Sequence, residues 1–155
     1  MGGIFSGRND YEASLELIRS LQAPSGMDSW LQHPRLCIQP FLEQMPLVLA
    51  ATDAAVCRAG SMTLAELAVA GIPALLVPYP YAAANHQAYN AVAVSQAGAA
   101  EVVADGALTS AVLCRYVQET FSVDEQRKAM GLAAKALGHP EATQAIVRQL
   151  LNWLS

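Results

Sequence analysis

Two runs of small and branched apolar residues, each followed by a loop and a helical segment, constrain the fold of this chain more than any other feature. Residues 54–57 read Ala-Ala-Val-Cys, and residues 74–77 read Ala-Leu-Leu-Val. Strands that are apolar at every position are typical of parallel sheets, which are covered on both faces. Residues 61–70 have helical length and composition, and Gly71 is placed to end that helix. The pattern therefore predicts a βαβ unit.

The same alternation continues on both sides of this unit. Two further strands are predicted at 36–39 and 101–103. Apolar spacing and turn residues predict helices at 11–21, 42–52, 85–96, 109–120, 122–138 and from Pro140 onward. We expect Ser61 and Asn85 to cap helices, and Ser122 with Glu125 to form a capping box. The expected architecture is an α/β fold in one domain, residues 1–155, with a Rossmann-like parallel sheet and helices on both faces.

The composition excludes two classes of function. The chain of 155 residues has nine Lys and Arg residues, scattered along it, and a formal net charge of −4. We expect no nucleic-acid partner, because there is no basic field to attract phosphates. Although 54% of the residues are hydrophobic, no apolar run reaches the roughly 20 residues of a membrane-spanning helix. The best candidate is interrupted by Glu66, Gly71 and Pro73.

The cysteines and the N-terminal residues indicate a compartment. The three cysteines are an odd number at wide spacings, and residues 1–7 are not typical of a secretory signal. We therefore expect reduced thiols and a cytoplasmic location.

The loop that follows the first apolar run is a candidate anion site. In open α/β sheets, ligands bind where the carboxyl ends of strands lead into helix N-termini. Gly60 lets a ligand approach the backbone, and the amides of Ser61, Met62 and Thr63 lie at the positive end of the predicted helix. This arrangement suits a phosphate or a diphosphate. On this loop alone, an ordinary strand-to-helix turn with a serine cap is the favoured alternative.

A carboxylate near the same helix start adds a second indication. Glu66 follows in an otherwise apolar helix. It could accept hydrogen bonds from the paired hydroxyls of a ribose beside a bound phosphate. The alternative is that Glu66 only complements the helix dipole.

The loop that follows the second apolar run is long and carries polar residues at its end. His86 and Gln87 lie in the first turn of the next predicted helix, beside the first loop if the two strands are neighbours. They offer donors and acceptors to sugar hydroxyls or phosphate, although a histidine at a helix start is more often a solvated residue. No serine–histidine–acid arrangement can be identified from spacing, so we expect no general base in this chain.

These two loops resemble the C-terminal domain of the MurG family. Residues 57–78 carry the resemblance and read Cys-Arg-Ala-Gly-Ser-Met-Thr-Leu-Ala-Glu-Leu-Ala-Val-Ala-Gly-Ile-Pro-Ala-Leu-Leu-Val-Pro. The run His-Gln-Ala-Tyr-Asn-Ala at 86–91 is similar to the cyanobacterial form of the family. The resemblance implies the C-terminal half of a GT-B glycosyltransferase with its N-terminal strands truncated. The implied reaction is inverting transfer of N-acetylglucosamine from UDP-GlcNAc to undecaprenyl-pyrophosphoryl-muramyl-pentapeptide, converting lipid I to lipid II in peptidoglycan synthesis.

The resemblance also implies roles for individual residues. The backbone of Leu42 would hold uracil, and the helix start of Ser61, Met62 and Thr63 would meet the diphosphate. The donor-binding stretch continues through Leu64 and Ala65 to Glu66, the ribose-binding glutamate. Gln87 would contact the donor sugar, with His86 as its polar neighbour. No metal and no cofactor are implied, because the helix dipole takes the role of a cation.

The family's N-terminal domain lies outside the resemblance. That domain carries the acceptor site, a candidate catalytic base and the membrane-contact surface, so we expect the lipid-linked acceptor and peripheral membrane association only when an acceptor domain is present. Gly2 and Gly3 match a glycine-rich loop of the family, but the serine that should follow and the strand before it are missing. An unpaired sheet edge would favour a homo-oligomer or a partner chain. The alternatives are a non-catalytic UDP-sugar-binding module and a related GT-B enzyme with a different lipid acceptor.

Overall fold

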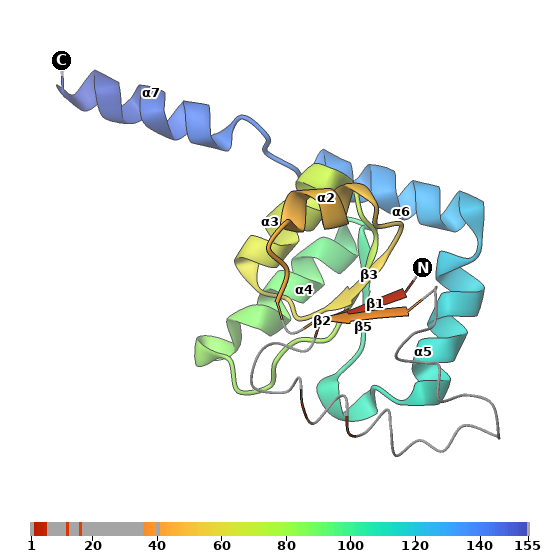
Figure 1. Cartoon of the computed structure of the whole chain (residues 1–155). Helices are drawn as coiled ribbons and strands as arrows, with labels where there is room; N and C mark the ends of the chain where they lie inside the picture. Colours follow the sequence, from red (N-terminus) through yellow and green to blue (C-terminus); the bar gives the residue numbers. More distant parts are fainter. Residues whose placement is uncertain (1, 6–11, 13–15, 17–35, 40, 155) are drawn as a thin grey trace. The chain divides into compact units, whose positions relative to one another are not determined.

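A computed structural model describes residues 2–5, 12, 16, 36–39 and 41–154 (Figure 1). The chain divides into two compact units, Met1–Met45 and Pro46–Ser155, and each is described by itself.

The first unit contains two parallel strands. β1 (Gly2–Phe5) pairs with β2 (Leu36–Gln39), with Gly2 opposite Leu36 and Phe5 opposite Gln39. The predicted bounds of β2 are confirmed. The comparison of Gly2 and Gly3 with a loop was wrong, because both glycines lie in β1, where their backbone groups pair with β2. The helix predicted at 11–21 lies outside the described residues except for Glu12 and Glu16, which are helical.

The second unit is built on a three-stranded parallel sheet. Its strands are β3 (Ala55–Cys57), β4 (Ala74–Leu76) and β5 (Ala100–Val102), in the order β3-β4-β5. The central strand β4 is buried at every residue, as its uniformly apolar sequence predicts. The fold class, a parallel sheet with Rossmann-like βαβ connections, is therefore confirmed.

Helices connect and follow these strands. Their bounds are α2 (Met45–Ala50), α3 (Ser61–Ala70), the 3₁₀ turn η2 (Ala83–Asn85), α4 (His86–Gln96), the 3₁₀ turn η3 (Asp105–Ala107), α5 (Ser110–Tyr116), the π-helical turn η4 (Val117–Phe121), α6 (Asp124–Ala136) and α7 (Ala142–Leu154). Within the described residues, no helix is both long enough and apolar enough to cross a bilayer.

The core lies between one face of the sheet and the helices α3 and α4. Leu67 of α3 and Ala91 of α4 are buried against residues of all three strands, among them Leu76. Cys57 packs at the edge of this core, and burial raises the pKa of its thiol to about 11. At β5, the hydroxyl of Thr120 in η4 donates to the carboxylate of Glu101 at 3.0 Å.

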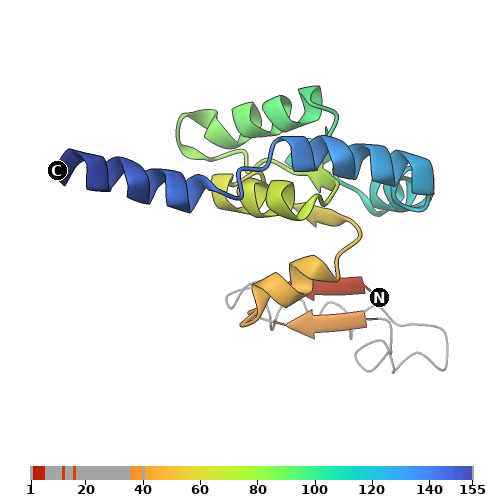
Figure 2. The same cartoon turned by 90° about the horizontal axis from the view of Figure 1, so that it is seen from above.

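Glycines allow α6 to lie very close to α3, and α6 runs beside α3 in Figure 2. Gly71 ends α3 in the left-handed conformation, with φ 69°, as predicted. A methyl group added to Gly131 would lie 2.8 Å from the carbonyl oxygen of Gly71, and one added to Gly138 would lie 3.0 Å from that of Ala68. The backbones of the two helices therefore meet without intervening side chains.

None of the three predicted side-chain caps forms. Gly60, not Ser61, is the N-cap of α3, and no described side chain caps that end. Asn85 is the N-cap residue of α4, as predicted, but its backbone is left-handed, with φ 55°, and its side chain makes no capping hydrogen bond. The capping box at Ser122 is absent because Ser122 Oγ donates to the Val117 carbonyl at 2.7 Å, a group that the preceding π turn makes available.

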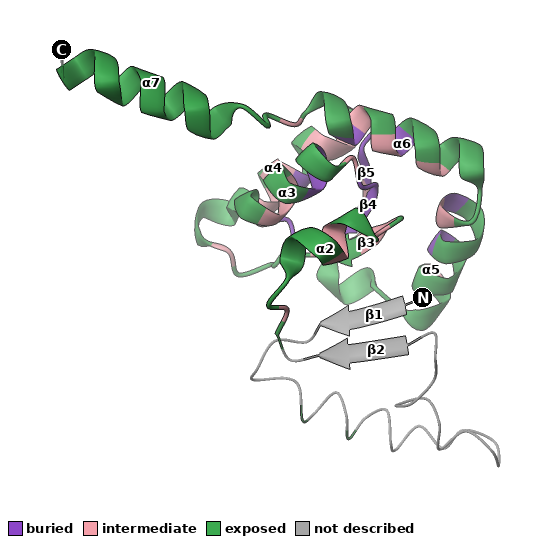
Figure 3. Cartoon of the chain, turned by 45° about the horizontal axis from the view of Figure 1, so that its top comes forward, coloured by how far each residue is buried: buried purple, intermediate pink, exposed green. Residues whose placement is uncertain are grey.

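The last helix has an unpartnered apolar face. Every described residue of α7 is exposed (Figure 3), including Ile146, Leu150 and Trp153. Its pattern is that of an amphipathic helix, as predicted from Pro140 onward.

Candidate functional site

The N-terminus of α3 lies at the carboxyl end of β3 and is open. Gly60 is the N-cap, with φ −70° and ψ 142°, and its carbonyl accepts the first helical bond from Leu64 N–H at 3.0 Å. Within the part of the chain that the structure describes, no side chain caps the first turn, and a methyl group at Gly60 would approach only Thr63 Oγ1, at 4.0 Å. The amides of Ser61–Thr63 therefore have no side-chain partner among the described residues, as an anion site requires.

The residues predicted for this site differ in exposure along α3. Ser61, Met62, Ala65 and Glu66 are exposed, and Thr63 is half-buried. The side chain of Leu64 instead packs against the core, and its amide is already bonded to Gly60. The exposed carboxylate of Glu66, in the second turn, can accept two hydroxyl hydrogen bonds.

The second predicted loop is held in an unusual conformation before α4. Ala84 and Asn85 both have positive φ, 48° and 55°, a strained conformation that is enriched at functional sites. His86 Nδ1 donates to the Ala83 carbonyl at 2.7 Å, which leaves Nε2 as its exposed nitrogen. Gln87 Oε1 accepts the Tyr79 N–H at 2.9 Å. Since its oxygen is occupied, Gln87 presents its amide nitrogen as a double donor.

Direct hydrogen bonds hold the two loops side by side, as predicted for neighbouring strands. Asn90 Nδ2, in α4, donates to the Ala59 carbonyl at 3.1 Å, directly before Gly60. The Val77 N–H donates to the Cys57 carbonyl at 2.9 Å, extending the pairing of β3 and β4. The open end of α3 and the start of α4 therefore belong to one edge of the sheet.

Sequence reasoning missed two side chains at this edge. Arg58 follows β3 and donates to the Val77 carbonyl at 3.2 Å and to Asp105 Oδ1 at 2.5 Å. Asn90 lies one turn into α4. The rule that ligands bind at strand ends could have identified Arg58, because it is the first residue after a buried strand.

Leu42 belongs to the first compact unit, where it is half-buried. Its role toward uracil stays a prediction.

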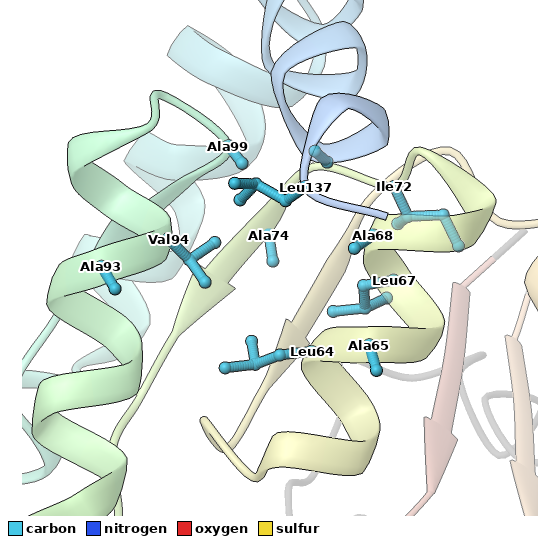
Figure 4. Close-up of a pocket in the computed structure, with 11 residues that line it drawn as sticks. Leu64, Ala65, Leu67, Ala68, Ile72, Ala74, Ala93, Val94, Ala99 and Leu137 are labelled. Atoms are coloured by element: carbon cyan, nitrogen blue, oxygen red, sulfur yellow. The ribbon is translucent and has the colours of Figure 1, made fainter. Parts of the chain in front are cut away.

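A cavity in the second unit lies along α3 beyond its open N-terminus and is chemically different from the strand-end site. It has a volume of about 250 Å³ and is lined by apolar side chains from α3, α4 and the end of α6, among them Leu64, Leu67, Val94 and Leu137 (Figure 4). An apolar lining does not suit a diphosphate. Among the residues that the structure describes, no group of three His, Cys, Asp or Glu side chains is placed to hold a metal ion.

The strand-end site combines three kinds of polar group. The helix dipole and first-turn amides of α3 favour an anion such as phosphate. The exposed Glu66 carboxylate can accept hydrogen bonds, and the amide nitrogen of Gln87 can donate them.

Comparisons with known proteins identify the family to which the chain belongs. The glycosyltransferase family 28 C-terminal domain matches residues 13–146. The chain is 43% identical over 147 residues to the UDP-N-acetylglucosamine–N-acetylmuramyl-(pentapeptide) pyrophosphoryl-undecaprenol N-acetylglucosamine transferase of Moorella thermoacetica, and 37% identical to that of Desulfitobacterium hafniense. Both alignments cover 95% of this chain and 38% of the relative. The chain therefore spans well under half the length of these relatives.

Solved structures give the same result. The crystal structure of Acinetobacter baumannii MurG matches with a TM-score of 0.76 and 30% identity, over 97% of this chain and 40% of that chain. The glycosyltransferase VinC, solved in complex with dTDP, shares the fold, with a TM-score of 0.59 and 22% identity. The sheet, the open helix end and the family match together show that this chain belongs to the glycosyltransferase family 28 C-terminal domain family.

Proposed function

We propose that this chain binds UDP-GlcNAc and supplies the donor half of a glycosyltransferase that transfers N-acetylglucosamine to undecaprenyl-pyrophosphoryl-muramyl-pentapeptide. The observation that carries the proposal is the open N-terminus of α3, with its Gly60 cap, beside the exposed Glu66 and the donor face of Gln87. The names of the relatives supply the substrate class.

In the proposed mechanism, the first turn of α3 stabilises the leaving group. Negative charge develops on the β-phosphate as the glycosidic bond to UDP breaks, and the amides of Ser61–Thr63 stabilise that charge without a metal ion. Glu66 accepts hydrogen bonds from the ribose hydroxyls, and the Leu42 backbone binds the uracil edge. Gln87, with His86 beside it, orients the sugar for attack from the opposite face.

The remaining parts of the reaction are proposed to come from an acceptor domain. A base there would deprotonate the acceptor hydroxyl, and its surface would contact the membrane on the cytoplasmic side. The cytoplasmic location agrees with the free thiols of Cys57 and Cys114. A separate partner chain would provide these parts in trans, whereas a homo-oligomer would cover an unpaired sheet edge.

Titration calorimetry with UDP and with UDP-GlcNAc tests donor binding. We expect the wild-type chain to bind both, with the same affinity in EDTA. Glu66→Ala should weaken binding about tenfold, the loss of one hydrogen-bonded charged contact, and leave the melting temperature unchanged because Glu66 is exposed. Glu125→Ala is the matched control, since Glu125 is also an exposed acid near a helix start.

The outcomes separate the candidate functions. No heat with wild type at high protein concentration contradicts donor binding. Binding without transfer, when an acceptor domain is added in trans, favours a non-catalytic UDP-sugar module. Transfer to a lipid acceptor other than the pentapeptide one favours a related GT-B enzyme.

A further inference from the structure

A single guanidinium nitrogen joins the ends of all three strands of the second unit. Arg58 Nη1, after β3, donates to the carbonyls of Val77 at 3.2 Å and Pro78 at 3.5 Å, after β4. It also pairs with Asp105 Oδ1 at 2.5 Å, after β5. The Arg58 Cζ atom lies 5.6 Å from the centre of the Tyr79 ring, a cation–π distance. Because Nη1 carries two hydrogens, the pair with Asp105 and the bond to Val77 are its main contacts, and the Pro78 contact is the weakest. The segment 77–79 is therefore held through the Val77 carbonyl and the Tyr79 ring.

That segment in turn fixes the orientation of Gln87. The Tyr79 N–H donates to Gln87 Oε1 at 2.9 Å. If the Gln87 amide turned over, its NH₂ group would face the Tyr79 N–H, two donors with no acceptor between them. As long as Tyr79 stays in place, the Gln87 nitrogen must point away from the loop.

We propose that Arg58 is a positioning residue, which aims the amide nitrogen of Gln87 at the sugar of a nucleotide-sugar donor by fixing the backbone at Tyr79. The inference rests on the proposed function for the ligand, but the network itself consists of contacts within this chain. Arg58 acts through Tyr79 and Gln87 and does not touch the sugar.

The exposure of the Arg58–Asp105 ion pair indicates that Arg58 positions the segment 77–79 and adds little to the stability of the fold. The Arg58 and Asp105 side chains are 49% and 42% exposed, and exposed ion pairs contribute little to the free energy of folding. A small displacement of a group that contacts a ligand has a much larger effect on binding than on folding.

The test compares the affinities of UDP and UDP-GlcNAc in the full chain. Arg58→Ala should weaken UDP-GlcNAc binding about tenfold and UDP binding less than twofold, because only the sugar contact depends on Gln87. Gln87→Ala should show the same selective loss, and the double variant should lose no more than either single variant, as expected for residues that act in series. Arg127→Ala is the matched control. Arg127 also donates to a backbone carbonyl, that of Phe121 at 2.9 Å, and pairs with an aspartate, Asp124.

A second measurement needs no ligand. The Tyr79 amide should exchange its hydrogen at least tenfold faster in Arg58→Ala than in wild type, while the amides of β4 keep their protection. An unchanged Tyr79 exchange rate, or equal losses for UDP and UDP-GlcNAc, would overturn the positioning role. If the wild-type chain binds neither nucleotide, the proposed function fails, whereas the exchange result still decides whether Arg58 holds the segment.

Discussion

Gly60 is the N-cap of α3, directly before the amides of the candidate anion site. Its backbone is extended, with φ −70°, a conformation that any residue can adopt. The backbone conformation therefore does not require a glycine at this position. The glycine leaves the N-cap without a side chain, and an added methyl group would have only Thr63 Oγ1 within 4.0 Å among the described residues.

Gly60→Ala should therefore reduce binding more than stability. We expect the affinity for UDP to fall at least fivefold, because the methyl group occupies the approach to the amides. The free energy of unfolding should fall by less than about 1 kcal/mol, since alanine is only a poorer N-cap. Calorimetry and thermal melts measure the two effects. Gly106→Ala, at a glycine with open space around it, is the control, and an unchanged UDP affinity in Gly60→Ala would contradict the expectation.

Cys57 and Cys114 should differ in reactivity. Burial raises the pKa of the Cys57 thiol from 9.0 to about 11, whereas Cys114 is exposed. At pH 8 we expect iodoacetamide to modify Cys114 at least ten times faster than Cys57, measured by mass spectrometry of the labelled peptides. In denaturant the two rates should converge.

The raised pKa of Cys57 also makes the free energy of unfolding depend on pH. Because the folded chain holds the Cys57 proton more tightly than the unfolded chain does, this contribution to stability is complete below pH 9 and is lost as the pH rises toward 11. Equal labelling of both cysteines in the native chain would show that the half-buried Cys57 thiol is as accessible as that of Cys114.

At the scale of elements, the close approach of α3 and α6 depends on Gly131. Replacing a glycine inside a helix by alanine normally stabilises the helix by up to about 1 kcal/mol. Here the added methyl group would lie 2.8 Å from the Gly71 carbonyl oxygen, closer than carbon and oxygen can approach. Gly131→Ala should therefore destabilise the chain by about 1–3 kcal/mol in urea unfolding. A stabilised variant would show that the helices are farther apart.

The sequence predicted the elements whose residue pattern lies within the element itself, and it did not predict features that depend on neighbouring segments. The strand cores and the end of α3 at Gly71 follow from local apolar runs and from glycine's freedom at positive φ. The absence of the predicted capping box at Ser122 could not be foreseen, because the π turn brings its hydroxyl to the Val117 carbonyl instead. The strain at Ala84 leaves no trace in the sequence, since alanine has no preference for that conformation.

Some residues of the candidate site could likewise be predicted from their local position, and others could not. Ser61 and Glu66 were indicated by their place after a buried strand, and Gln87 by its place at the next helix start. Arg58 and Asp105 are far apart in sequence and meet only because β3, β4 and β5 end at one edge of the sheet. Neither the sequence around Arg58 nor that around Asp105 indicates the pair, because the order of the strands in the sheet brings the two side chains together.

At the scale of the whole molecule, α7 contributes an apolar surface without contributing to the core. None of its residues is buried. Removing residues 142–154 should therefore change the melting temperature by less than about 2 °C, since no core residue is lost. Because the apolar face of α7 is exposed, we expect the full chain to self-associate at high protein concentration. The weight-average mass measured by light scattering should then be lower for the truncated chain.

A variant of full length separates the effect of the apolar face from that of chain length. Ile146→Asp with Leu150→Asp keeps α7 but charges its apolar face. It should lower self-association as much as the truncation does. A fall of 5 °C or more in the truncated chain would show that α7 packs against the rest of the second unit.

The glycine contacts between α3 and α6 also have a consequence for the order of folding. The β3–α3–β4–α4 segment that carries the site is continuous in sequence, so its contacts close short loops and can form quickly. The contact of Gly71 with Gly131, in contrast, joins α3 to α6 across a long stretch of chain. Closing that longer loop has a larger entropic cost. During synthesis on the ribosome, the sheet edge that carries the candidate site would thus be assembled before α6, the helix that packs against α3, has emerged.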